Sequence, residues 1–85
     1  MLLLVVSDVT PARSGGVHLL PRLEAVDVND RGPFAVRLVA ADGSVREARA
    51  VIDVPHVRGS APPIGMLRVL DVTPDAIAVG TRVER

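Results

Sequence analysis

Apolar runs that end at turn-forming residues follow one another along the whole chain. Four of the runs end in the dipeptide Asp-Val, which a turn-forming residue then follows; the copies are Asp8-Val9, Asp27-Val28, Asp53-Val54 and Asp71-Val72. Such a boundary is typical of a β-strand that enters a turn. No segment of ten or more residues has clean helical spacing, and the one candidate for a helical turn is 75–78, after Pro74. The pattern predicts an all-β domain, or one mainly of β-strands with at most one short helical turn.

The expected strands are short and mostly antiparallel. They occupy residues 2–6, 17–20, 23–28, 34–40, 45–54, 66–72, 76–79 and 81–84. Turn signals recur at about the 8–12-residue spacing that is typical of all-β sandwiches and barrels. We therefore expect a small barrel or sandwich of six to eight strands.

The first apolar run, residues 2–6, is continuous rather than alternating. Continuous apolarity predicts a strand that is buried on both faces, either in the middle of a barrel or under a partner. The run is too short to span a bilayer, and no basic segment precedes it. We therefore expect a strand, no membrane association and a cytoplasmic protein.

The clearest element is a hairpin over residues 34–54 around Asp42-Gly43. A two-residue loop would place Val36 opposite Arg49, so that charged and apolar side chains share a face. A three-residue loop, 41–43, with a left-handed Gly43 shifts the pairing by one residue and separates the two kinds of side chain. The apolar face then consists of Phe34, Val36, Leu38, Ala40, Ala48, Ala50 and Ile52, with Arg46 near its open end. The pattern therefore selects the three-residue loop.

Prolines and glycines mark the other loops. We expect a loop over residues 10–16, a strand end at Pro21, and no interior strand over residues 55–65, which hold three prolines and two glycines. The Asp of each Asp-Val dipeptide is expected to cap its turn by accepting a hydrogen bond from a backbone amide two residues on.

The chain is short for the apolar surface that it carries. Its 85 residues make one domain, 1–85; 48% are hydrophobic, and Phe34 is the single aromatic. The core must then consist of Val, Leu, Ile and Ala, and with no Cys a disulfide cannot add stability. Because aliphatic residues exceed what so small a domain encloses, we expect burial against a second copy or another protein.

Charge gives little support to a nucleic-acid partner. Ten acidic residues balance ten basic ones, which are all Arg and are spread singly along the chain. A GC-rich genome accounts for this usage; the alternative is that Arg forks serve bidentate contacts to carboxylate or phosphate. Duplex binding needs a basic surface, and single-strand binding needs several stacking aromatics. The nucleic-acid alternative therefore requires Arg37, Arg46, Arg49 and Arg58 on one face.

Candidate chemistry is sparse. His18 and His56, with Asp8 or Asp53, offer ligand types that zinc accepts, but their spacing contains no local ligand motif. A Ser-His-Asp set would use His56 and Asp53, and its candidate nucleophiles are Ser7, Ser14, Ser44 and Ser60. None of these serines lies in a Gly-x-Ser-x-Gly elbow. We therefore expect no enzyme, no cofactor and no metal site.

One stretch resembles a known family. Pro21-Arg22-Leu23, the strand 34–39 and the segment from Ala41-Asp42-Gly43 to Val45-Arg46-Glu47 are similar to a widespread family of small β-rich bacterial domains of unknown function. The resemblance covers residues 21–54 and implies a β-hairpin fold. It implies no active-site residue, and Ala40 stands where the family tends to have an aromatic.

The strand 2–6 and the loop 55–65 are the predicted contact sites for a partner. Prolines restrict the free loop, which lowers the ordering cost of docking; the alternative is that the loop only crosses one end of the barrel and covers its core. We expect a non-catalytic protein-interaction or assembly module, as a homo-oligomer or accessory subunit. The alternative is a small nucleic-acid-binding β-barrel with dispersed Arg residues. The candidate contact residues are Leu2, Leu4, Val6, His56, Val57, Arg58 and Ile64.

Overall fold

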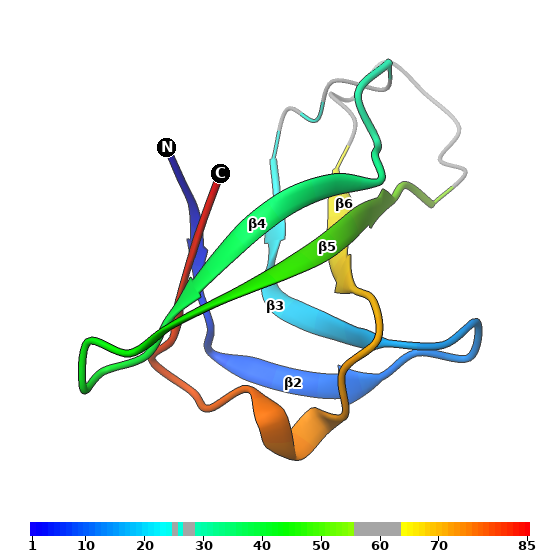
Figure 1. Cartoon of the computed structure of the whole chain (residues 1–85). Helices are drawn as coiled ribbons and strands as arrows, with labels where there is room; N and C mark the ends of the chain where they lie inside the picture. Colours follow the sequence, from blue (N-terminus) through cyan, green and yellow to red (C-terminus); the bar gives the residue numbers. More distant parts are fainter. Residues whose placement is uncertain (25, 27–28, 56–63) are drawn as a thin grey trace.

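Seven short strands and one 3₁₀ turn make up the described part of the chain (Figure 1). The structure, a computed structural model, describes residues 1–24, 26, 29–55 and 64–85. In chain order the elements are β1 (Leu2–Val5), β2 (Asp8–Pro11), β3 (Val17–Leu23), β4 (Phe34–Val39), β5 (Val45–Asp53), β6 (Gly65–Val69), the 3₁₀ turn η1 (Pro74–Ala76) and β7 (Arg82–Glu84). The predicted all-β class is confirmed.

The strands form one antiparallel sheet that curls into a half-barrel (Figure 1). Their order across the sheet is β1-β7-β4-β5-β6-β3-β2. Its two edge strands, β1 and β2, are consecutive in the chain. Between them, the Val6 amide donates to the Thr81 carbonyl near β7, and the Ser7 amide donates to the Leu20 carbonyl in β3. The junction of β1 and β2 therefore bridges the two edges of the curled sheet.

The inner face of the sheet carries an aliphatic core. Buried and exposed residues alternate along β4, so that Phe34, Val36 and Leu38 point inward. The buried hydrophobic residues are Leu4, Val6, Val17, Leu19, Val26, Phe34, Val36, Leu38, Ala50, Leu67, Val69, Ile77 and Val83. This set contains one aromatic ring, as the composition predicts.

The hairpin of β4 and β5 has the predicted register. Val36 lies opposite Ala48, and the Ala40 amide donates to the Ser44 carbonyl, so the loop has three residues. Gly43 has a φ of 87°, in the left-handed region where a glycine costs least. Arg46 lies opposite Leu38 and is exposed. Separation of charged from apolar side chains was therefore a sufficient guide to the register.

Strand β3 continues through Pro21, so the prediction that Pro21 ends a strand is wrong. The pairing with β2 stops at Leu20, and the pairing with β6 is irregular between Leu19 and Leu23. A proline has no amide hydrogen to donate, but because the pairing is irregular around Pro21, no regular ladder hydrogen bond requires one at this position. Of the strand expected over 23–28, Leu23 belongs to β3, and residues 25, 27 and 28 lie outside the described residues.

The loop expected over residues 10–16 is shorter than predicted, because β2 continues to Pro11 at the edge of the sheet. The turn that follows is closed by the Ala12 amide, which donates to the Gly16 carbonyl. Gly16 has a φ of 78°, and a Cβ there would collide with the Val69 carbonyl. The turn therefore needs a glycine at this position.

The first apolar run is buried on one face only within the single chain. Leu4 and Val6 are 5% and 1% exposed, whereas Leu2 and Val5 are 53% and 45% exposed. A bulge between Leu2 and Leu4 places Leu2 on the same outer face as Val5. The mid-barrel alternative is therefore wrong, and burial under a partner stays a prediction.

The chain after β6 makes a helical turn and then the last strand. The strand expected over 76–79 is wrong, and η1 lies near the alternative position for one helical turn. Ile77, directly after η1, is 4% exposed and packs into the core, and η1 lies against β2. Among the described residues, no helix is both long and apolar enough to cross a membrane.

Candidate functional site

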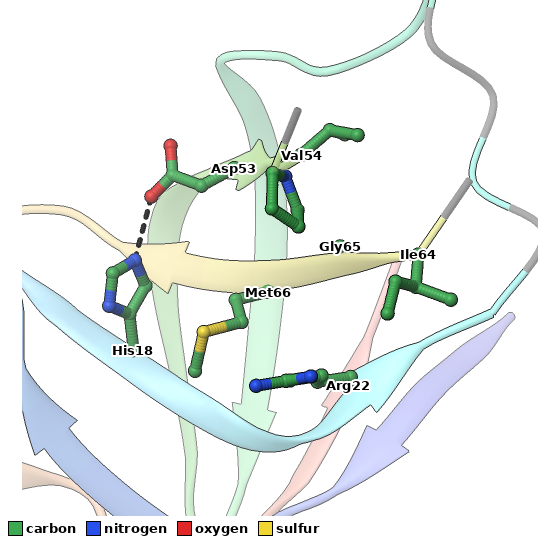
Figure 2. Close-up of a pocket in the computed structure, with 8 residues that line it drawn as sticks. His18, Arg22, Asp53, Val54, Ile64, Gly65 and Met66 are labelled. Carbon is green, nitrogen blue, oxygen red and sulfur yellow. Dashed lines mark hydrogen bonds and ion pairs between the residues drawn. The ribbon is translucent and has the colours of Figure 1, made fainter. Parts of the chain in front are cut away.

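A hollow on the outer face of the sheet gathers side chains from three neighbouring strands (Figure 2). Its volume is about 480 Å³. Its lining residues are His18 and Arg22 from β3, Asp53 from β5, Gly65 and Met66 from β6, and the adjoining Val54, Pro55 and Ile64. The size lies within the range of small-molecule sites, and a largely apolar wall with a few polar groups is also typical of them.

Strand pairing brings three polar side chains together beside this hollow. His18 in β3 lies opposite Arg68 in β6. Arg68 in turn lies opposite Val51 in β5, two residues before Asp53. Because residues two apart on a strand share a face, His18, Arg68 and Asp53 all lie on the outer face.

The Asp53 carboxylate accepts hydrogen bonds from both of these neighbours. His18 Nε2 lies 2.7 Å from Asp53 Oδ2, and Arg68 Nε lies 2.8 Å from the same oxygen. Since an ionised carboxylate only accepts, we place the imidazole proton on Nε2. Arg68 Nη1 also donates to the Gly15 carbonyl, at 3.1 Å. The network therefore ties β3, β5 and β6 to the turn between β2 and β3.

The surroundings of Asp53 favour its ionised form. Partial burial works to raise the pKa of Asp53, but the hydrogen bonds from Arg68 and His18 and the positive charge of Arg68 outweigh it. The net pKa of Asp53 therefore lies below the ordinary value for an aspartate. Because the Arg68 guanidinium matches the ionised carboxylate, the pair adds little net charge to the hollow.

Arg22 is the cation among the described residues that line the hollow. It lies on the exposed part of β3 after Pro21, and Figure 2 shows its side chain below Met66. Within the part of the chain that the structure describes, it makes no hydrogen bond or ion pair. Its charge is therefore unmatched there, in contrast to that of Arg68.

The free edge of β1 is the second candidate surface. Among the described strands, β1 pairs only with β7, so one side of its backbone has no hydrogen-bonded strand partner, although β3 also contacts β1. A cleft of about 500 Å³ is lined by residues 1–4 on one side and by residues 21–24 on another. The exposed Leu2 and Val5 lie on this edge strand, and Met1 is also exposed.

The other edge, β2, lacks these properties. Pro11 has no amide to offer, and the Asp8 carboxylate accepts the Val9 amide at 2.8 Å. The turn η1 also lies against β2. Edge strands of natural proteins are commonly protected by such charges, prolines and covering segments.

The structure separates the predicted contact residues into three groups. Leu2 lies on the exposed edge, whereas Leu4 and Val6 belong to the core and present no surface to a partner. Ile64 lines the hollow around Arg22. The remaining three candidates lie outside the described residues; they are His56, Val57 and Arg58.

Asp53 differs from its predicted role as a turn cap. Its carboxylate binds side chains of neighbouring strands, because it is the last residue of β5 and lies on the outer face. The cap predicted for the Asp-Val dipeptides is found at Asp42 instead, whose Oδ1 accepts the Ser44 amide two residues on.

The candidate Ser-His-Asp set is not assembled among the described residues. Asp53 binds an imidazole, but it is that of His18, and no serine hydroxyl of the described residues donates to that ring. Nor does any group of three or more potential metal-ligating side chains occur in the described ranges.

Nucleic-acid binding requires its Arg residues on one face, and the three that the structure describes do not share a face. Arg37 and Arg49 lie on the outer face of the hairpin, with Glu47 beside them. Arg46 lies opposite Leu38 on the other face, because its position in β5 has the opposite parity. Arg46 therefore does not meet this requirement of the nucleic-acid alternative, and Arg58 lies outside the described residues.

Comparisons of the chain with protein-family models, curated proteins and solved structures find no match. The resemblance over residues 21–54 therefore stays a prediction.

The Asp53 network and Arg22 were not found from the sequence. Arg68 is 15 residues from Asp53 and 50 from His18, so only the strand order brings these groups together. One local signal existed: His18 and Arg68 each lie between two apolar residues in an alternating strand, which places both on an outer face.

Proposed function

We propose that this protein is a non-catalytic protein-interaction module that assembles with a second copy of itself through β1. The observation that supports this is an edge strand of four aliphatic residues, Leu2–Val5, with one unpaired side and exposed Leu2 and Val5. Addition of another strand satisfies the free backbone groups and removes these side chains from water.

Self-complementarity favours a second copy as the partner. Two antiparallel β1 strands can be related by a two-fold axis between Leu3 and Leu4. This arrangement places Leu2 of each copy opposite the partner's Val5. Since the bulge in β1 puts Leu2 and Val5 on one face, the two side chains meet as a cross-strand pair.

Catalysis is not part of the proposed function. The potential base His18 is bound to Asp53, which Arg68 also holds, so the network serves to fix three strands. A nucleic-acid partner is also left out, because Arg46 lies on the opposite face from Arg37 and Arg49.

Sedimentation equilibrium tests the assembly. The chain has no Trp or Tyr, so interference optics suit it better than ultraviolet absorbance. Loading concentrations from about 1 to about 200 µM cover the affinities expected of a small interface. We expect the mass to rise from 9.0 kDa toward twice that value.

Two matched variants locate the interface. Val5→Lys introduces a charge that occurs twice across the two-fold axis, and it should raise the dissociation constant at least about tenfold. Val45→Lys makes the same change at a valine that is 58% exposed on the hairpin, and it should leave the dissociation constant unchanged. A mass of one chain at every concentration contradicts the proposal, and so does an equal response to the two variants.

A further inference from the structure

We infer that the hollow around Arg22 is a binding site for a small aliphatic carboxylate, a monoanion with an apolar body. This site lies on the outer face of β3, β5 and β6, and its role goes beyond the proposed assembly through β1. The inference rests on the charge, the lining and the size of the hollow.

The charge of the hollow calls for an anion. Asp53 and Arg68 neutralise each other, since Arg68 Nε lies 2.8 Å and Nη2 3.4 Å from the two carboxylate oxygens. His18 donates to the same carboxylate. Arg22 is then the cation lining the hollow that makes no ion pair or hydrogen bond with the described residues. A guanidinium fork binds a carboxylate through two parallel hydrogen bonds.

The rest of the lining calls for an apolar body on that anion. Val54, Pro55, Ile64 and Met66 form the greater part of the wall. Met66 has a flexible side chain that adapts to ligands of different shape. A volume of about 480 Å³ accommodates a chain of several carbons beside the charged head.

Asp53 makes a carboxylate more suitable than a phosphate. The single charge of Arg22 balances a monoanionic head, whereas a dianionic head leaves an excess negative charge in a hollow that the Asp53 carboxylate also lines. The carboxylate head therefore lies at the Arg22 side, and the aliphatic body lies against Met66 and Ile64.

Octanoate is the probe, and His18 is the reporter. The aromatic region of the proton NMR spectrum contains only Phe34 and two histidines, because the chain has no Trp or Tyr. A His56→Gln variant assigns the two imidazole Cε1 protons. We expect octanoate to shift the His18 signal saturably, with a dissociation constant of about 1 mM or below for a ligand of this size. Octanol and octylammonium, which have the same body without the negative head, should bind at least about tenfold more weakly.

Matched variants test the role of the guanidinium. Arg22→Gln should weaken octanoate binding at least about tenfold, because it removes a charge-assisted hydrogen bond. Arg46→Gln, the same change at an exposed Arg of the hairpin, should leave the affinity unchanged. Arg22 also lines the cleft beside β1, so Val5→Lys is titrated too and should bind octanoate as the wild type does.

The outcomes separate this inference from the proposed assembly. The inference holds if octanoate binds saturably, octanol and octylammonium bind at least about tenfold more weakly, and only Arg22→Gln weakens octanoate binding. Equal responses to octanoate and octanol overturn it, as do equal losses in the Arg22 and Arg46 variants. Tighter binding of octyl phosphate assigns the hollow to phosphate and overturns the carboxylate assignment. Loss of binding in Val5→Lys moves the site to the β1 edge, which also overturns it.

Discussion

Strands β1 and β2 are the two edges of one sheet and follow each other in the chain, yet different interactions hold them. β1 is fixed by apolar packing of Leu4 into the core and presents Leu2 and Val5 to solvent. β2 ends at Pro11, its Asp8 carboxylate accepts a hydrogen bond from the Val9 amide, and η1 lies alongside the strand. The turn after β2 is also tied to Asp53 through Arg68, which binds the Gly15 carbonyl.

The comparison shows that an edge is protected by particular residues and not by its position. Both strands contain four residues and lie at an edge, but only β2 has the charge and proline that commonly prevent association. Among the described residues, β1 is the edge strand that carries exposed large hydrophobic side chains, Leu2 and Val5. This difference between the two edges is the reason that the proposed contact with a second copy is at β1.

The largest expected effect is the difference in stability loss between substitutions on the two faces of β1. Leu4→Ala removes a side chain that is 5% exposed, and it should lower the free energy of unfolding by about 2–4 kcal/mol. Leu2→Ala, the same change at a position 53% exposed, should lower it by less than about 1 kcal/mol in the monomer. Urea unfolding of both variants at low concentration measures the difference, and equal losses would refute the assignment of faces.

The next effect tests the polar anchoring near β2. Asp53→Asn removes the charged acceptor of Arg68 and His18, and it should cost about 1 kcal/mol at neutral pH, because the 42% exposed side chain is screened by water. The folded-state pKa of Asp53 is lowered, so its contribution is present above the unfolded pKa and is lost as pH falls through the folded pKa.

The wild type should therefore lose its advantage over Asp53→Asn below about pH 4. Urea midpoints from neutral to acid pH measure this difference, and Asp71→Asn provides the same chemical change in a turn. A constant difference between wild type and Asp53→Asn over the whole range is incompatible with the network.

The smallest effect concerns the protection of β2. Asp8→Val makes this edge more like β1, but Pro11 and η1 remain in place. We expect a change in stability within about 0.5 kcal/mol and no assembly beyond the dimer. Light scattering after size exclusion checks the mass; chains of more than two copies would show that Asp8 alone protects the edge.

Much of the fold could be predicted because, in those segments, the pattern of apolar and polar side chains fits only one arrangement of strands. In the hairpin, one register separates apolar from charged residues, and Gly43 supplies the left-handed turn. Prediction failed where local rules met tertiary pairing. Pro21 is tolerated because the ladder is irregular at that point, and Ile77 joins the core after a 3₁₀ turn rather than in a strand.

The candidate site was predictable only in fragments. Leu2 and Ile64 were predicted as contact residues; Leu2 is exposed and Ile64 lines the hollow, and their contact with a partner stays a prediction. Leu4 and Val6 were assigned to an interface because a continuous run does not show where a bulge changes the faces. The hollow around Arg22 depends on which strands are neighbours, and no local pattern specifies that β6 lies between β3 and β5.

An isotope-filtered NOE experiment tests pairing through β1 most directly. Equal amounts of carbon-13-labelled and unlabelled chains are mixed at a concentration where the dimer predominates. We expect NOEs between the Leu2 methyl groups of one chain and the Val5 methyl groups of the other, since cross-strand neighbours lie within about 5.5 Å. Intermolecular NOEs confined to other strands, or none at all, would contradict the assignment of β1 as the interface.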